Sequence, residues 1–422
     1  MGSVNSWTTG DLPLIPCHKI HDFLSGGVIM KFIDAQDISG KRLLIRVDYN
    51  VPLKNGEIQD DNRIKASIPT LKLALEKKAS LVVCSHLGKP KGEVKPELSL
   101  SPAAKRLEEL LEVQVDLAPH CSGPDTLKMA QNLKPGQVLM LENLRFHPGE
   151  QKNDPEFARE LSGMGHAYVN DAFGVSHRAH ASVVGVTDFF DLCMGGLLLK
   201  KEWEYLTRVL NPARPFVLIS GGAKVSSKLG VLYNLMEKVD SMVIGGAMAN
   251  TFIRSMGFET GKSLVEDELL DEAAKIMHKA RENNVSFYLP VDFIVGDSPD
   301  SSEGAEVVPF QNIPGHKMAL DVGPATCTLF AEVLNKAKTI VWNGPMGAFE
   351  NRTFAQGSYN IAELIAELPA ETIVGGGDTD ALIHKLDIAS KFSFISTGGG
   401  SFMEFLEGKT LPGFKALQDK DT

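Results

Sequence analysis

The stretch ETIVGGGDT, residues 371–379, runs from a short apolar strand into three glycines, an aspartate and a threonine. A glycine-rich turn after a strand usually exposes backbone N–H groups, which bind the oxygens of a phosphate. Asp378 places a carboxylate at the mouth of this turn, where it would repel a phosphate. The stretch therefore predicts a strand followed by an anion-binding turn, and the role of the carboxylate needs an explanation.

The same alternation of short apolar strands and helices extends from Met30 almost to the end of the chain. Helices are expected at 62–78, 101–112 and 203–210, and strands at 43–49, 80–86, 137–143, 167–171, 216–220, 241–246, 287–291, 339–344, 372–376 and 392–396. Strands that are apolar along most of their length need cover on both faces, which indicates parallel sheets flanked by helices. So many strands would make one sheet unusually wide, and two sheets are expected instead.

The break between the two sheets is predicted where the helix at 203–210 meets the proline-rich segment NPARP, residues 211–215. The fold class is therefore α/β, with two doubly wound, Rossmann-like domains joined by a hinge helix and a ligand cleft between them. Their expected bounds are 30–205 and 206–407. Ligands in such sheets bind beyond the carboxyl ends of the strands.

Residues 1–29 read differently from the rest of the chain. They contain glycine, serine and proline breakers and show neither a sustained period nor the basic-then-apolar order of a signal peptide. We expect them to form a poorly ordered N-terminal extension.

Composition excludes several function classes. The 422-residue chain has 43% apolar and 23% charged residues, and its formal charge of −10 argues against non-specific binding of nucleic acid or anionic membranes. No apolar run reaches the ~18 residues of a transmembrane helix. The five cysteines are scattered without a C-x-x-C pair, which favours reduced thiols in a cytoplasm over a zinc site or disulfides.

Basic side chains concentrate in the loops that follow the strands of the first half. These loops are RVDYN (46–50), DDNRIK (60–65), SHLGKPK (85–91), ENLRFHP (142–148) and DAFGVSHRAHAS (171–182). Any one arginine alone is best explained as a member of an ion pair. Five such loops at one sheet edge of an acidic protein instead favour a small polyanion, because arginine binds phosphate or carboxylate through two parallel hydrogen bonds.

The second half supplies glycines at the corresponding positions. They lie in SGGAKVSSKLG (220–230), IGGAM (244–248), WNGPMGAFE (342–350), VGGGDT (374–379) and STGGGSF (396–402). One glycine-rich turn is weak evidence, because tight strand-to-helix turns are common. Five turns after apolar runs predict a polyphosphate site.

Two familiar nucleotide motifs are excluded. GFETGKS, residues 257–263, has three residues between its glycines where a P-loop has four, and it follows a stretch that reads as a helix rather than a strand. No G-x-G-x-x-G fingerprint is present, which counts against a dinucleotide oxidoreductase.

Taken together and in this order, the motifs resemble those of phosphoglycerate kinases. The resemblance runs from about Met30 to residues 411–417 and rests on RVDYNVP, SHLG-P, ENLRF, HRAHAS, GGAKVSSK, WNGPMG-FE, GGGDT and STGGG. It implies a kinase that exchanges phosphate between 1,3-bisphosphoglycerate and ADP, giving 3-phosphoglycerate and ATP, with Mg²⁺ accompanying the nucleotide. It also implies a monomer that closes by a hinge, with the tail 408–422 packing back on the N-terminal domain.

The resemblance also implies site residues. Those for 3-phosphoglycerate would be Asp48, Tyr49, Asn50, Arg63, His86, Leu87, Gly88, Lys89, Arg145 and Arg178. Those for the nucleotide would be Lys224 and Lys228 at its phosphates, Glu350 at the ribose, and Gly376, Gly377, Asp378 and Thr379 at the phosphate end, with Asp378 on Mg²⁺. Two features depart from the family pattern. Lys89 stands where the family usually has arginine, and residues 1–29 have no usual counterpart.

Mg²⁺ explains the carboxylate in the opening stretch, because this ion takes oxygen ligands from one or two carboxylates together with substrate phosphates. A carboxylate acceptor has a pKa near ~3.5 and is already ionised at neutral pH, so the reaction requires no general base. Catalysis then reduces to positioning two anions and stabilising the transferred phosphoryl group. Lys224, Arg63 and the N–H groups of Gly377 and Gly399 are the candidates for that stabilisation, which requires the domains to close.

Two other functions stay open at this point. The chain could be a phosphotransferase for a different acyl phosphate, because the basic loops specify an anion without identifying it. It could also be a catalytically silent nucleotide-binding regulatory protein. The joint presence of Arg63, Lys224, Lys228 and Asp378 argues against a pure binder, which has no need of a metal carboxylate.

Overall fold

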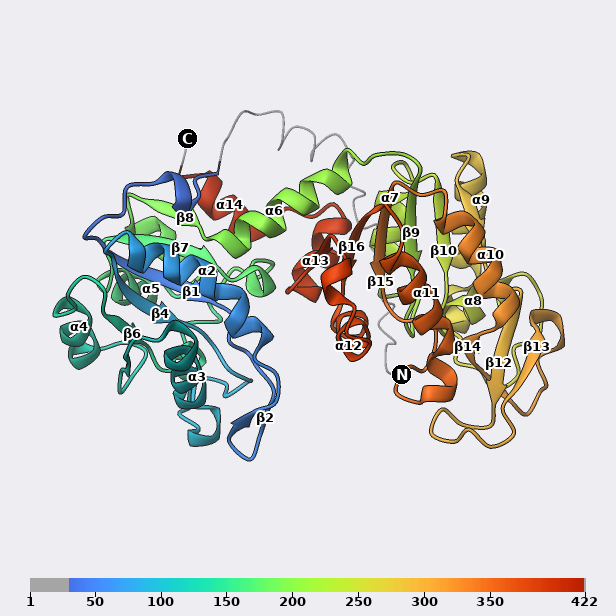
Figure 1. The fold of residues 1–422 in the computed structure, drawn as a ribbon, viewed down its shortest axis with the longest axis horizontal. Coiled ribbons are helices and arrows are strands. Elements are labelled where there is room, and N and C mark those ends of the chain that lie inside the picture. The colour runs from blue at the N-terminus through green and yellow to red at the C-terminus, as the bar shows by residue number, and fades with distance from the viewer. Residues whose placement is uncertain (1–29, 421–422) are drawn as a thin grey trace, which may run out of the picture.

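The computed structural model describes residues 30–420, so the expectation for the extension 1–29 lies outside the described residues. Two lobes lie side by side, one built from the first half of the chain and the other mainly from the second (Figure 1). Each lobe contains a six-stranded parallel sheet. The α/β class with two parallel-sheet domains is confirmed.

The first sheet has the strand order β5-β6-β4-β1-β7-β8. Its strands are β1 (Arg42–Val47), β4 (Ser80–Cys84), β5 (Val115–Leu117), β6 (Val138–Met140), β7 (Ala167–Asp171) and β8 (Cys193–Gly195), with helices α2 (Asn62–Glu76), α3 (Ser101–Leu111), α4 (Pro124–Gln131) and α5 (Pro155–Ser162). Alternate residues of β1 enter different cores, Leu43 and Ile45 on one face and Leu44 on the other. Both faces are therefore buried, as the apolar strands predict.

The second sheet has the strand order β11-β10-β9-β15-β16-β17. Its strands are β9 (Phe216–Ser220), β10 (Ser241–Ile244), β11 (Ser286–Tyr288), β15 (Thr339–Asn343), β16 (Glu371–Gly375) and β17 (Phe394–Ile395). Its helices are α7 (Leu229–Leu235), α8 (Met248–Ser255), α9 (Leu270–Glu282), α10 (Pro324–Leu334), α11 (Gln356–Ala366), α12 (Gly377–Lys385) and α13 (Gly399–Leu406). The turn of the opening stretch joins β16 directly to α12.

Sequence patterning did not predict the antiparallel elements and some of the shortest strands. A three-stranded sheet of order β13-β12-β14 follows β11, and a two-stranded hairpin follows β1. Their strands are β12 (Asp292–Gly296), β13 (Glu306–Pro309), β14 (Met318–Val322), β2 (Leu53–Lys54) and β3 (Glu57–Ile58). Strands β5 and β8 have three residues each, too few to establish a period.

Helix α6 (Leu197–Leu210) runs from one lobe to the other (Figure 1). It begins before the expected 203 and ends at the proline-rich segment. The ring of Tyr205 stacks on Phe394 of the second sheet at 4.6 Å. The proposed domain boundary at 205/206 falls inside this helix and stays a prediction.

The C-terminal helix α14 (Pro412–Gln418) lies against the first lobe. Phe414 makes an edge contact with Trp203 of α6 at 5.1 Å and stacks on Phe173 at 5.9 Å. The backbone N–H of Gly413 donates to the carbonyl of Ser176 at 2.8 Å. Within residues 30–420, no helix is long and apolar enough to cross a membrane.

A buried carboxylate connects α6 to the loop after β17. Glu202 is fully buried, and its Oε1 accepts hydrogen bonds from the backbone N–H of Thr397 at 2.8 Å and from its hydroxyl at 2.9 Å. Its Oε2 is buried without a hydrogen-bond partner. Burial raises the pKa of Glu202 to about 7, against the bonds from Thr397 that favour the ionised form.

Replacing Glu202 by glutamine tests whether burial of the ionised carboxylate lowers the stability of the fold. The folded pKa is raised above the unfolded one, so ionisation of Glu202 reduces stability progressively between pH 4.5 and about 7 and by its full amount above that range. Glu202→Gln mimics the protonated acid and keeps the acceptor for Thr397. We expect the free energy of unfolding of Glu202→Gln, measured by urea titration, to be close to that of the wild type at pH 5. At pH 8 it should exceed the wild-type value by on the order of 1–3 kcal/mol. A variant less stable than the wild type at pH 8 would contradict this account.

Candidate active site

The loops that follow β1 and β4, with the start of α2, form a charged cluster in the first lobe. Arg63, in the first turn of α2, donates to Asp48 Oδ2 at 3.0 Å and to the carbonyl of Asn50 at 3.4 Å. His86 Nδ1 lies 3.6 Å from Asp48 Oδ1. Burial and the neighbouring arginines hold the pKa of His86 well below its ordinary value, so its imidazole is neutral at physiological pH.

A second part of the cluster centres on Gly88. The backbone N–H of Gly88 donates to Asn50 Oδ1 at 2.9 Å, and its carbonyl accepts from Arg145 Nη1 at 2.7 Å. Burial, together with the positive charges of Arg46 and Arg178, lowers the pKa of Arg145 to about 10. Arg145 Nε is buried without a partner. An anionic ligand would stabilise Arg145, because it would neutralise the buried charge and accept a hydrogen bond from Nε.

The remaining residues expected at this site divide into supporting and exposed positions. Tyr49 is fully buried, with its hydroxyl 2.7 Å from that of Ser67. Leu87 is also buried, and its N–H donates to Asn143 Oδ1 at 3.2 Å. These two side chains hold loops in place. Lys89 and Arg178 are exposed, and Arg178 Nε donates to His177 Nε2 at 3.1 Å.

Arg46 is a member of the cluster that belongs to the basic stretch RVDYN but was not among the expected substrate-binding residues. It is fully buried, its Nη2 lies 3.2 Å from His86 Nδ1, and its Nε donates to Ser182 Oγ at 2.9 Å. Ser182 Oγ donates in turn to buried Glu150 at 2.6 Å. The available signal was strand period, because a charged residue on the same face as Leu44 in an apolar strand must point into the core.

The glycine-rich turns of the second lobe surround a pocket of about 370 Å³. The lining residues include Gly222, Lys228, Asn343, Gly344, Gly376, Gly377, Asp378, Thr379 and Gly399. The turn of the opening stretch thus lies at a cavity, at the start of α12. The first helical turn presents unpaired N–H groups there, and it carries the exposed carboxylate of Asp378.

Buried polar contacts hold this turn. Thr379 Oγ1 accepts from the N–H of Gly344 at 2.8 Å, and Asn343 Nδ2 donates to the carbonyl of Gly375 at 2.6 Å. Gly376 has φ +101°, a backbone conformation that other residues rarely adopt, and a Cβ there would lie 2.8 Å from Asn343 Nδ2. Both the backbone conformation and the lack of space therefore favour glycine. Thr379 therefore shapes the turn from behind.

Lys228 is the cation at the pocket wall. Its Nζ donates to Asn343 Oδ1. Burial lowers the pKa of Lys228 to about 8, and the negative charges of Asp378 and Glu407 oppose the shift. Phosphate oxygens would raise the pKa of this ammonium group again.

The structure does not bring Lys224 or Glu350 to this pocket. Both side chains are exposed, and neither is among the residues that line the cavity. Their expected contacts with nucleotide therefore stay predictions.

The two lobes meet where α13 begins. Ser401 Oγ donates to the carbonyl of Phe173 at 2.6 Å and lies 2.8 Å from His177 Nδ1. A Cβ on Gly398 would lie 2.8 Å from the Cα of Gly174 and 2.6 Å from the Phe173 ring. A Cβ on Gly174 would lie 2.4 Å from Asp48 Oδ2. Glycine at both positions lets the second lobe approach the charged cluster closely.

The chain matches the family model described as phosphoglycerate kinase over residues 33–409. It is 57% identical to the phosphoglycerate kinase of Maridesulfovibrio salexigens, covering 92% of this chain and 100% of that protein, and 52% identical to that of a Geobacter species, covering 93% and 99%. The solved structure of phosphoglycerate kinase from Coxiella burnetii has a TM-score of 0.86 at 42% identity, covering 93% of this chain and 100% of that one.

Fold and site define an α/β phosphotransferase of two parallel-sheet domains, with a cationic cluster on one and a glycine-lined pocket on the other. The chain belongs to the phosphoglycerate kinase family. It is a kinase of glycolysis that transfers a phosphoryl group reversibly between a carboxyl group and a nucleotide.

Gly398→Ala tests the glycine contact between the lobes. The added Cβ would push α13 away from Phe173 and Gly174 without touching either pocket wall. Misplacement of about 1 Å costs on the order of a hundredfold in rate, so kcat should fall by about ten- to a hundredfold while both KM values change little.

Gly315→Ala is the matched control, because a Cβ there would have nothing within 4 Å and should leave kcat unchanged. Steady-state kinetics of the two variants tests whether turnover depends on the contact between Gly398 and Gly174. A wild-type kcat for Gly398→Ala would show that it does not.

Proposed function

We propose that the charged cluster holds 3-phosphoglycerate or 1,3-bisphosphoglycerate and that the glycine-lined pocket holds the phosphates of ADP or ATP. The observation that carries this proposal is that a buried arginine with an unpaired Nε, Arg145, lies in one lobe and a glycine-lined pocket of about 370 Å³ lies in the other, with the two lobes in close contact at Gly174 and Gly398. Asn50, Arg63 and Arg145 would bind the acid, with Arg178 and Lys89 adding positive charge at the rim. Gly376, Gly377 and Thr379 would form the turn around the nucleotide phosphates.

The test is formation of ATP from ADP and 1,3-bisphosphoglycerate. A phosphotransferase for another acyl phosphate would instead turn over acetyl phosphate at a comparable rate. A silent regulatory protein would bind ADP without forming ATP. Measuring both reactions and ADP binding on one preparation separates the three functions.

We propose that the chemistry needs charge stabilisation and no general base. The acceptor carboxylate has a pKa near ~3.5 and is ionised. His86, the nearest histidine to Asp48, is kept neutral and would serve as a hydrogen-bonding group. Arg63 from one lobe and the N–H groups of Gly377 and Gly399 from the other would stabilise charge on the transferred phosphoryl group once the domains close.

Asp378 suits a Mg²⁺–nucleotide. Its exposed carboxylate lies on the wall of the glycine-lined pocket. Among the described residues there is no group of three or more acidic, histidine or cysteine side chains that could hold a metal by themselves. One carboxylate together with phosphate oxygens is a common donor set for Mg²⁺. When bound, Mg²⁺ would neutralise charge on the phosphates.

Asp378→Ala should therefore affect the nucleotide side alone. We expect a large loss of kcat and weaker binding of Mg²⁺–ADP, with the affinity for 3-phosphoglycerate unchanged within about twofold, because the acid site lies on the other lobe. Calorimetry with each ligand separately measures this, and the isosteric Asp378→Asn shows whether the charge is needed. A large loss of 3-phosphoglycerate affinity would refute the assignment.

Lys224 is exposed in the structure, so its proposed role depends on closure and on bound nucleotide. If Lys224 stabilises the transition state, Lys224→Ala should lower kcat and kcat/KM together, by on the order of a hundredfold or more. If it only attracts nucleotide, KM for ATP should rise, kcat should hold, and high salt should erase the difference. Kinetics at two salt concentrations distinguishes these cases, and an unchanged kcat would remove Lys224 from the catalytic set. Lys228→Ala provides the comparison with a lysine that lines the pocket.

We also propose a monomer that acts in the cytoplasm. Within residues 30–420, Cys84, Cys121 and Cys327 are free thiols. Free thiols suit a reducing compartment. Light scattering coupled to size exclusion tests the monomer directly.

A further inference from the structure

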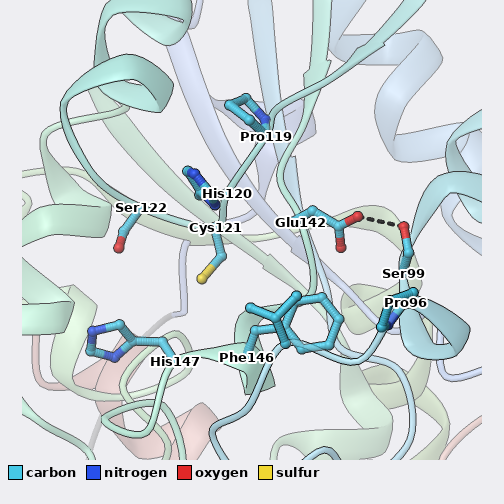
Figure 2. A pocket seen from close by; sticks show the side chains of 10 residues that line it. Pro96, Ser99, Pro119, His120, Cys121, Ser122, Glu142, Phe146 and His147 are labelled. Carbon is cyan, nitrogen blue, oxygen red and sulfur yellow. Dashed lines mark hydrogen bonds between the residues drawn. The ribbon is translucent and has the colours of Figure 1, made fainter.

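A separate pocket of about 570 Å³ lies in the first lobe, beyond the carboxyl ends of β5 and β6. Its walls come from residues 94–99, 119–122 and 142–147. Figure 2 shows Cys121 and Phe146 on different walls, with Glu142 hydrogen-bonded to Ser99 beside them. This volume lies in the range of small-molecule sites.

The side chains that line this pocket disfavour anionic ligands such as the enzyme's substrates. Val94 at the rim is 70% exposed, and the Phe146 ring is half-buried, so a ligand would cover apolar surface. Glu142 is held in place, with Oε2 accepting from the N–H groups of Asn143 at 2.7 Å and Leu100 at 3.3 Å. Its carboxylate would repel a phosphate or carboxylate.

The pocket also offers a hydrogen-bond donor. His147 Nδ1 accepts from the N–H of Gly149 at 3.1 Å, which puts the proton of the neutral ring on Nε2. The ring is fixed by stacking on Phe157 at 4.0 Å. An apolar wall with one aromatic face and one fixed donor fits a neutral aromatic molecule that carries a hydrogen-bond acceptor.

The walls of this pocket continue into the loops of the substrate cluster. Asn143, next to Glu142, donates through Nδ2 to the carbonyls of Leu87 at 2.7 Å and Leu98 at 2.9 Å. Leu98 covers Gly88 so closely that a Cβ there would lie 2.8 Å from its Cδ2. Arg145 immediately precedes Phe146, and its carbonyl accepts from the N–H of Gly92 at 3.1 Å.

We propose that this pocket binds a neutral aromatic molecule of one or two rings, and that its occupation tightens binding of the phosphorylated acid at Gly88 and Arg145. A ligand wedged between the 94–99 and 142–147 walls would hold both loops in one position and reduce the ordering cost of substrate binding. The coupling rests on the proposed function of the charged cluster; the binding site itself does not.

The probe is 2-naphthol, whose hydroxyl oxygen can accept a hydrogen bond, titrated into the full-length protein by calorimetry with and without 3-phosphoglycerate. We expect saturable 1:1 binding and a fall in the Kd of 3-phosphoglycerate by about fivefold at saturating probe, the lower end of ordinary allosteric coupling. Ser122→Trp fills the pocket and should abolish both effects. Ser39→Trp, at an exposed position away from the pocket, is the control and should preserve them.

A second variant, at the exposed rim of the pocket, keeps the site testable if Ser122→Trp fails to fold. Val94→Asp changes a side chain that is 70% exposed and should weaken probe binding at least several-fold while the protein remains folded. Absence of probe binding to the wild type, or unchanged binding in both pocket variants, overturns the site. Binding without a change in 3-phosphoglycerate affinity overturns the coupling. Failure of the proposed function is distinct, because 3-phosphoglycerate would then not bind even without probe.

Discussion

The close approach of Gly398 to Gly174 is the constraint on which the arrangement of the site depends. No side chain fits at either position, because a Cβ on one would meet the backbone of the other lobe and a Cβ on the other would meet Asp48. The beginning of α13 can therefore lie beside the loop that carries the charged cluster. A larger residue at Gly398 would hold α13 away from the loop that carries the charged cluster.

The charged cluster lowers the stability of the fold, because it buries positive charges next to one another. Arg46 is fully buried, and Arg145 is largely buried with one donor unused. Repulsion and burial together lower the pKa of Arg145 to about 10, and they keep His86 neutral. Glu150 supplies the nearest fully buried negative charge, and it reaches Arg46 only through Ser182. Under the proposed function, a bound polyanion would offset this repulsion, so the cluster suits anion binding better than it suits stability of the fold.

Much of the fold was predictable because the parallel strands are long and apolar, as in β9 and β16, and because glycine-rich turns follow them. The pattern did not give β5, which alternates around the polar Asp116, or β12, because an antiparallel sheet inserted after β11 breaks the alternation. Motif resemblance directed attention to Lys228 and Asp378, and both line one cavity; their contacts with nucleotide stay predictions. It could not position Lys224, because the placement of an exposed lysine depends on a ligand and on closure rather than on local sequence.

The contact between Glu202 and Thr397 connects α6 to the segment that lies between the charged cluster and the glycine-lined pocket. Thr397, bound to α6, is followed at once by Gly398 against Gly174 and by Gly399, whose Cβ position lies 3.4 Å from the Cα of Gly376. Ser401, two residues later, bonds to Phe173. Residues 397–401 therefore touch α6, the first lobe and the turn after β16 in succession. Because the segment is so short, a displacement of α6 relative to either lobe would change all three contacts together, and this would couple the proposed domain closure to the geometry of the site.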